Sequence, residues 1–225
     1  MSTQYERLAG QSLERVAALS DGVFAVAMTL LVLDLDVPAV LGIHDDAELW
    51  AELVNILPSA LAYVMSFLTL GIFWLGQQAQ LDLYKRSDRN FIWLNFGFLF
   101  MVSLMPFSTK FLAAFHSNEY HIALIVYWLN ILLLGLMLYL GRHYMARSGL
   151  LKDEVTPAMW RAGDRRIVQA QAFYLVCILL SFMSTTFSIA AFILVQLNYA
   201  VLPWIRILYR GIFKLAGRQP KADVE

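Results

Sequence analysis

Asp21 is the residue whose position points most directly to chemistry. It follows Ser20 near the start of an otherwise apolar stretch, residues 15–35, which reads RVAALSDGVFAVAMTLLVLDL. A carboxylate inside a membrane span is costly, and it is usually retained because it binds an ion, relays protons or forms hydrogen bonds within a helix bundle. Asp21 is therefore either a substrate, ion or proton site, or a structural anchor.

Helical geometry relates Asp21 to four other side chains of this stretch. At about 100° per residue, with Val26 at zero, Leu30 falls near 40° and Leu33 near −20°. Thr29 falls near −60° and completes one stripe, whereas Asp21 falls near 220°, on the other side. If the stripe lines a pore, Asp21 faces neighbouring helices; if Asp21 lines it, the stripe faces protein or lipid. This spacing also occurs on any packed helix, so it does not establish a pore.

Composition indicates that a membrane holds these residues. Hydrophobic residues make up 60% of the 225 and charged residues 15%, against about 45–50% and about 25% in soluble domains. The formal net charge is zero, which gives no reason to expect a nucleic-acid partner. The single cysteine, Cys177, excludes an intrachain disulfide.

We predict an all-α membrane protein with a six-span domain over residues 1–214 and a disordered cytoplasmic tail over residues 215–225. About 20 helical residues cross the hydrocarbon core. The long uncharged run after residue 166 is divided at the polar cluster Ser184-Thr185-Thr186, which predicts a helical hairpin. The predicted spans are about 15–35, 53–76, 91–110, 120–141, 167–183 and 188–206.

The basic residues predict the orientation. With these spans, 16 of the 17 Lys and Arg fall on one side, and only Lys110 falls on the other. Positive loops stay in the cytoplasm, so we expect both termini there and a location in the plasma membrane. Asp34 and Asp36 then lie at the outer end of the first span, where they either concentrate cations or are solvated residues of a helix end.

Polar groups of the third predicted span also need partners. Asn95 and Ser103 should find hydrogen bonds within the bundle, and Pro106 should bend the helix. Trp74 and Trp93 lie near predicted span ends, as interface anchors do.

Two segments of the sequence, in the first and third predicted spans, resemble the transmembrane-protein-175 type potassium channels. Residues 15–25, with Arg15 followed by Leu19-Ser20-Asp21-Gly22, and residues 29–33 are similar to the first-span signature Arg-x-x-x-Phe-Ser-Asp-Gly. Residues 93–95, Trp-Leu-Asn, and 104–107, Leu-Met-Pro-Phe, are similar to the family's third span. The six-span layout agrees with the family, so the resemblance covers most of the chain.

The resemblance implies a homotetramer in which the first spans surround a central pore. It places a hydrophobic constriction, in place of a carbonyl filter, on Val26, Leu30 and Leu33, and a polar layer on Thr29. It implies a structural network of Arg15, Ser20, Asp21, Trp93 and Asn95. It implies passive transport of permeant K⁺ and other monovalent cations without a cofactor or a metal site, and the lipid bilayer and further copies of the chain as partners.

Two departures from the family's pattern concern this network. Leu19 replaces the family's Phe, and Gln77-Gln78 replaces a pair of His after Phe-Trp. Because Gln does not titrate near neutral pH, pH dependence through this position is not expected.

Other function classes compete with a potassium channel. A proton-permeable channel is an alternative, since protons can cross an apolar neck along a water wire. A cation-coupled secondary transporter would use Asp21 or Asn95, but the sequence has no inverted repeat. It also has no HExxH, no Cys/His cluster and no Gly-x-Ser-x-Gly, so a membrane enzyme is the least favoured class.

Overall fold

The computed structural model describes residues 12–35, 44–115 and 121–215, and regular structure in these residues is helical. A single isolated bridge, Tyr84 to Leu151, joins two connections. The elements are α2 (Leu13–Leu30), η1 (Leu31–Asp34), α3 (Asp46–Asn55), α4 (Leu57–Leu81), α5 (Arg89–Ser103), α6 (Met105–Ala114), α7 (His121–Arg147), α8 (Pro157–Leu180) and α9 (Thr185–Leu215).

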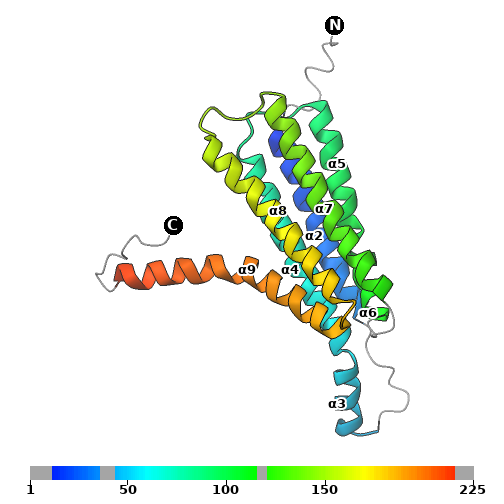
Figure 1. Ribbon diagram of the computed structural model, residues 1–225. Coiled ribbons are helices and arrows are strands. Elements are labelled where there is room, and N and C mark those ends of the chain that lie inside the picture. Colours follow the sequence, from blue (N-terminus) through cyan, green and yellow to red (C-terminus); the bar gives the residue numbers. More distant parts are fainter. Residues whose placement is uncertain (1–11, 36–43, 116–120, 216–225) are drawn as a thin grey trace.

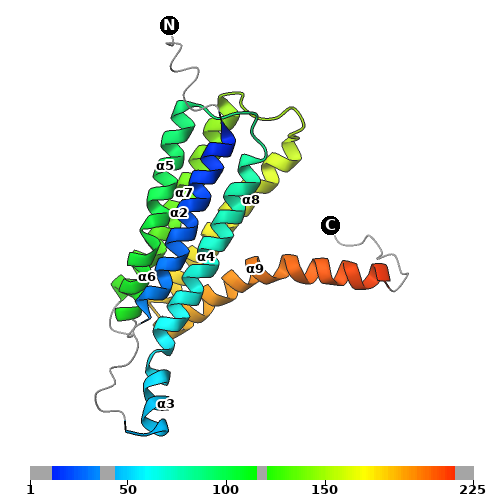
Figure 2. The ribbon, with the colours of Figure 1, turned by 180° about the vertical axis from the view of Figure 1, so that it is seen from behind.

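The helices form an elongated bundle with two distinct ends (Figure 1). Helices α2, α4, α5 and α7 run side by side, α8 crosses them obliquely, and α9 diverges so that its C-terminal half projects from the bundle. The start of α2 and the α4–α5 and α7–α8 connections lie at one end, and α3 projects from the other (Figure 2). Lys85, Arg86 and Lys152 belong to these connections, and we call this the basic end.

Local sequence explains where the helices begin and end. The side chains of Ser12, Asp45, Asp88 and Thr156 each accept a backbone N–H of the following first turn, which satisfies donors that the helix itself leaves unpaired. Helix α7 ends at a glycine cap: Gly149 has a φ of 66°, and the Leu150 N–H donates to Met145 O at 3.2 Å.

Four helices of the described residues are long and apolar enough to cross a membrane: Leu13–Leu33, Leu57–Leu81, Arg89–Ala114 and His121–Arg147. They coincide with the first four predicted spans. The predicted fifth span, 167–183, overlaps α8 up to its end at Leu180. The sixth falls within α9, where the apolar helical stretch is the shorter Thr185–Ala200. The turn expected at Ser184 lies between α8 and α9. The predicted tail from residue 216 onwards lies outside the described residues.

Two prolines shape the second and third spans. Helix α4 begins at Leu57 with Pro58 in its first turn, four residues later than position 53, and α3 precedes it as a separate helix. The third span is broken at Leu104 into α5 and α6, because Pro106 has no N–H to continue the α5 ladder.

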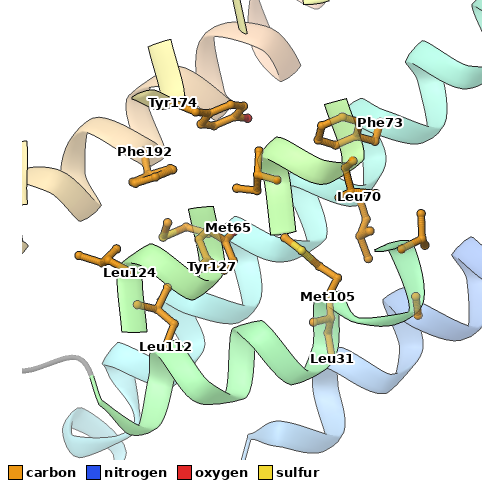
Figure 3. Close-up of a cluster of buried hydrophobic side chains, with 14 of the residues drawn as sticks. Leu31, Met65, Leu70, Phe73, Met105, Leu112, Leu124, Tyr127, Tyr174 and Phe192 are labelled. Carbon is orange, nitrogen blue, oxygen red and sulfur yellow. The ribbon is translucent and has the colours of Figure 1, made fainter. Parts of the chain in front are cut away.

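The main core is formed by α4, α6 and α7, with side chains of α2, η1, α5, α8 and the start of α9 packed around them (Figure 3). Met65, Leu70, Tyr127 and Phe192 are buried in it. Buried polar groups join the helices: Thr109 Oγ1 donates to Ser66 Oγ at 2.6 Å, and Gln196 Nε2 donates to Thr69 Oγ1 at 2.7 Å. Such bonds stabilise helix packing where no water is available, and the second one holds α9 against α4.

Candidate functional site: the two faces of the first helix

One face of α2 is packed against the bundle and the other is open. Ser20, Phe24, Ala27 and Leu31 are buried, and Figure 2 shows α2 between α4 and α5. On the open face, Val26 is 58% exposed, Leu30 43% and Leu33 71%. These three side chains thus form an apolar stripe that the subunit does not cover.

Thr29 lies beside this stripe and is also exposed. Its hydroxyl donates back to its own helix, at 2.9 Å from both Ala25 O and Val26 O. Because the hydroxyl proton is used within the helix, the oxygen lone pairs remain available as acceptors. Oxygen acceptors are the groups that can replace the hydration of a cation.

The buried side of α2 carries a polar network centred on Ser20. Its hydroxyl donates to Val16 O at 2.8 Å and accepts from Gln77 Nε2 at 2.9 Å. Gln77 Nε2 also donates to Asn95 Oδ1 at 2.7 Å, and Asn95 Nδ2 lies 3.4 Å from Ser20 Oγ. Side chains of α2, α4 and α5 therefore meet at one buried point.

Asp21 makes a separate set of hydrogen bonds. Its Oδ1 accepts from Trp74 Nε1 at 2.7 Å and from Gln78 Nε2 at 2.8 Å. Both donors belong to α4. Asp21 therefore bonds to the neighbouring helix rather than to the side on which Val26 and Leu30 lie.

Within the described part of the chain, Arg15 and Trp93 take no part in these networks. Arg15 is exposed, and its recorded hydrogen bond runs from its backbone N–H to Ser12 Oγ at 3.3 Å. Trp93 is 65% exposed and its ring centroid lies 5.7 Å from that of Phe96. Asp36 and the side chain of Asp34 lie outside the described residues.

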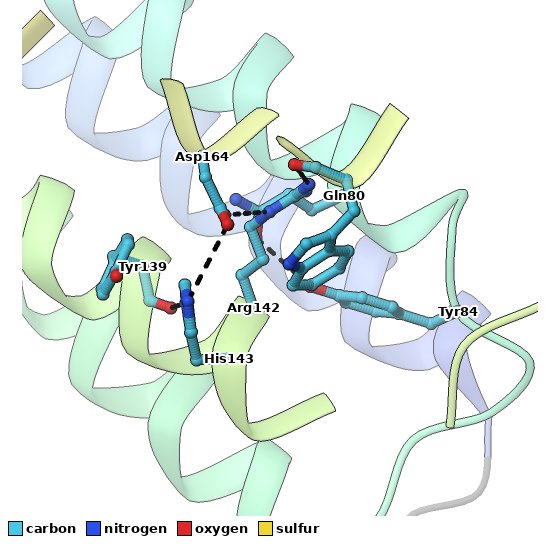
Figure 4. A network of polar contacts seen from close by, with 7 residues as sticks. Gln80, Tyr84, Tyr139, Arg142, His143 and Asp164 are labelled. Atoms are coloured by element: carbon cyan, nitrogen blue, oxygen red, sulfur yellow. Dashed lines mark hydrogen bonds and ion pairs between the residues drawn. The ribbon is translucent and has the colours of Figure 1, made fainter. Parts of the chain in front are cut away.

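Sequence reasoning missed three partners and one buried cluster. Trp74 is predicted only as an interface anchor, and Gln77 and Gln78 only as a departure from the family's pattern. The cluster lies at the basic end, where Arg142 is 2% exposed and donates through Nε to Asp164 Oδ1 at 2.8 Å (Figure 4). The Arg142 side chain also bonds Trp160 O at 2.6 Å and lies 3.7 Å above the Trp160 ring.

This cluster joins α7 to α8 and reaches the loop after α4. Tyr84 donates to Gln80 Oε1 at 3.3 Å, and burial is the main cause that raises the pKa of its hydroxyl. Tyr84 thus stays a neutral donor at physiological pH. Gly163 directly precedes Asp164, and its missing side chain lets the Arg142 guanidinium approach α8 closely. The glycine beside the carboxylate was the available sequence signal for the contact between Arg142 and α8.

Comparison with known proteins finds similarity to potassium channels. The family profile described as "Endosomal/lysosomal potassium channel TMEM175" matches residues 15–106, which include the α2 stripe and both polar networks. A potassium channel of Streptomyces collinus is 35% identical over 188 residues, 82% of this chain and 90% of that protein.

A solved structure is also similar. The crystal structure of a lysosomal potassium-selective channel TMEM175 homolog from Chamaesiphon minutus superposes with a TM-score of 0.71 at 28% identity, covering 84% of this chain and 96% of that one. The human endosomal/lysosomal proton channel TMEM175 is 29% identical over 91% of this chain, which spans 42% of the human protein.

Proposed function

The chain belongs to the TMEM175 family, whose members are membrane ion channels rather than enzymes, and we propose that it is a potassium-permeable cation channel lined by α2 of four identical subunits. The observation that carries this proposal is the uncovered stripe of Val26, Leu30 and Leu33. In a bilayer such an apolar face is covered either by lipid or by another helix. Because the stripe lies within the segment that the potassium-channel family profile matches, we assign its partner to further copies of the same helix.

The proposed pore follows from the open face of α2. A single α2 cannot enclose a path, whereas four copies around an axis can. Leu30 and Leu33 are three residues apart across the start of the 3₁₀ turn η1, and residues at this spacing lie one above the other in such a turn. They would form successive apolar rings toward the end of α2 away from the basic end.

Apolar rings control flow by dewetting: a narrow neck holds no continuous water, and a wider one admits hydrated ions. Thr29 would supply a ring of oxygen acceptors between the Val26 and Leu30 rings. Asp34 and Asp36 would raise the local cation concentration at the outer mouth. This arrangement needs no cofactor, and passive transport follows the potassium gradient.

The polar networks support the rigid placement of α2. Ser20 is bonded to Gln77 and lies within reach of Asn95, and Asp21 is bonded to Trp74 and Gln78. We assign these residues to holding α2 in its rotation, so that the stripe faces the axis. Arg15 lies near −20° on the same helical scale and would be at the inner entrance of the pore.

The proposed subunit has six membrane spans and both termini in the cytoplasm. The proposed location is the plasma membrane. Concentration of basic residues at one end supports this orientation.

A proton-permeable channel is the second candidate, because the human relative is named a proton channel. In that case protons would cross the apolar neck along transient water wires. A coupled transporter is less supported, because Asp21 is engaged with α4 and faces away from the stripe.

Flux from liposomes tests these candidates. Purified protein in vesicles with a potassium gradient should dissipate that gradient without any coupled ion, and sodium and proton gradients run in parallel give the relative permeabilities. Potassium movement that requires an opposing substrate or ion would contradict a channel. Proton flux that persists without potassium flux would favour the second candidate.

A further inference from the structure

A cavity outside the proposed pore lies between α4, α7, α8 and α9, near the basic end. Its volume is about 240 Å³ and it is open on one side. Its walls are largely apolar and include Ile72, Phe73, Leu138 and Ile167. A single water needs about 10–15 Å³ of such volume, so the space is far larger than a packing defect.

Small residues on facing helices create this space. Gly76 and Ala79 of α4 and Gly163 and Ala170 of α8 all line the cavity. Protein interiors are normally close-packed. The space beside Gly163 and Gly76 is taken by Arg142 and Leu138, whereas the small side chains of Ala79 and Ala170 leave the cavity beside them unfilled.

The mouth of the cavity is positively charged. Arg166 is exposed, and its guanidinium lies 5.9 Å from the centroid of the Tyr199 ring. Among the described residues, no carboxylate forms an ion pair with it. Arg142, which also lines the cavity, is already paired with Asp164. Arg166 is therefore the cation available for an anionic ligand.

The deeper part of the cavity presents two polar atoms without hydrogen bonds. Tyr174 is buried, and neither its hydroxyl nor Gln171 Oε1 has a partner in the described residues. Tyr174 is eight residues beyond Arg166 on α8, a rise of about 12 Å. In Figure 3 the Tyr174 hydroxyl is directed to the side on which Phe73 lies, and Phe73 also lines the cavity.

We propose that this cavity binds an anionic phospholipid from the membrane leaflet at the basic end. The phosphate would pair with Arg166, an ester carbonyl of the glycerol region would accept from the Tyr174 hydroxyl, and an acyl chain would lie along the apolar walls. Basic pockets between membrane helices bind anionic lipid head groups in this way. A soluble anion alone would leave the apolar walls uncovered.

Native mass spectrometry of the purified full-length chain tests the proposal. The probes are palmitoyl-oleoyl phosphatidylglycerol, phosphatidylcholine with the same acyl chains, and inorganic phosphate as a competitor. The variants are Arg166→Gln, which removes the charge at the mouth, and Ala170→Leu, which fills the cavity. Arg165→Gln is the matched control, because Arg165 is exposed on α8 but does not line the cavity.

Wild type and Arg165→Gln should retain phosphatidylglycerol equally, and Arg166→Gln should bind it about five- to tenfold more weakly. Ala170→Leu should lose both lipids while keeping its unfolding temperature. Equal losses in Arg165→Gln and Arg166→Gln, displacement of the lipid by millimolar phosphate, or full lipid retention by Ala170→Leu would each overturn the proposal.

Discussion

The indole nitrogen of Trp74 on α4 lies 2.7 Å from Oδ1 of Asp21 on α2. This bond joins the carboxylate of Asp21 to a neighbouring helix. The same oxygen accepts from Gln78, so two donors of α4 fix the rotation of α2. The structural reading of Asp21 is thereby favoured over a role as a transported-ion ligand.

Replacing Asp21 separates these readings. Asp21→Ala removes the acceptor of both bonds and should lower the free energy of unfolding by about 1–2 kcal/mol. Asp21→Asn keeps an oxygen acceptor and should lose less. Thermal unfolding in detergent and the assembled mass measure the effect. A fully assembled Asp21→Ala protein that differs only in ion selectivity would place Asp21 in the pore instead.

Gln77 offers a test of pH dependence. Its amide is buried between Ser20 and Asn95, and it does not titrate. In Gln77→His, protonation of the imidazole would bury a cation that neither Ser20 nor Asn95 can neutralise, so the folded protein would resist protonation at this position. The unfolded chain would then bind more protons, so stability should fall as the pH is lowered from about 7.5 to about 5.

Thermal unfolding over this pH range measures that difference against Gln77→Asn, which introduces no titratable group. A pH profile of Gln77→His parallel to that of Gln77→Asn would show that the position is not buried in the assembled protein.

Gly163 is predicted to be required for the cluster at the basic end. A Cβ at this position would lie 2.5–2.8 Å from the guanidinium atoms of Arg142, so Gly163→Ala should displace Arg142 from Asp164 and destabilise the α7–α8 contact. Gly71→Ala is the matched control, because a Cβ there meets nothing within 4 Å. Equal unfolding temperatures for the two variants would contradict this packing.

Much of the fold could be predicted from apolar segments and charges. The second, third and fourth spans follow from runs without charge, because the bilayer sets their length. The first span follows from extending a short uncharged run to that length, and the turn between α8 and α9 follows from the polar cluster at Ser184. The bend in the third span follows from Pro106, whose missing N–H is a local property.

The partners within the bundle could not be predicted in the same way. Gln77 meets Ser20 only because α2 and α4 pack with a particular rotation and register. The predicted fourth span ends at residue 141, which places Arg142 in the loop that follows. Arg142 is instead buried, because α7 continues to Arg147. On α8, the carboxylate of Asp164 and the carbonyl oxygen of Trp160 compensate the charge of Arg142. These are tertiary properties that no single segment encodes.

Cross-linking tests the fourfold arrangement. Leu33→Cys should form disulfides between subunits on mild oxidation, since copies around the axis bring their η1 turns together and a disulfide requires Cα atoms within about 7 Å. Val32→Cys, also exposed but directed elsewhere on the turn, is the control. Native Cys177 is buried and serves as an unreactive background. Monomers alone from Leu33→Cys would argue against a shared axis.

The central claim is that the stripe on α2 forms the constriction, and potassium flux through Leu30→Ala in liposomes tests it most directly. Val32→Ala, which truncates a similarly exposed aliphatic side chain outside the stripe by two carbon atoms instead of three, is the control. We expect Leu30→Ala to increase cation leak about tenfold or more by admitting water to the neck, and Val32→Ala to conduct as the wild type does. Unchanged flux in correctly assembled Leu30→Ala would contradict the claim.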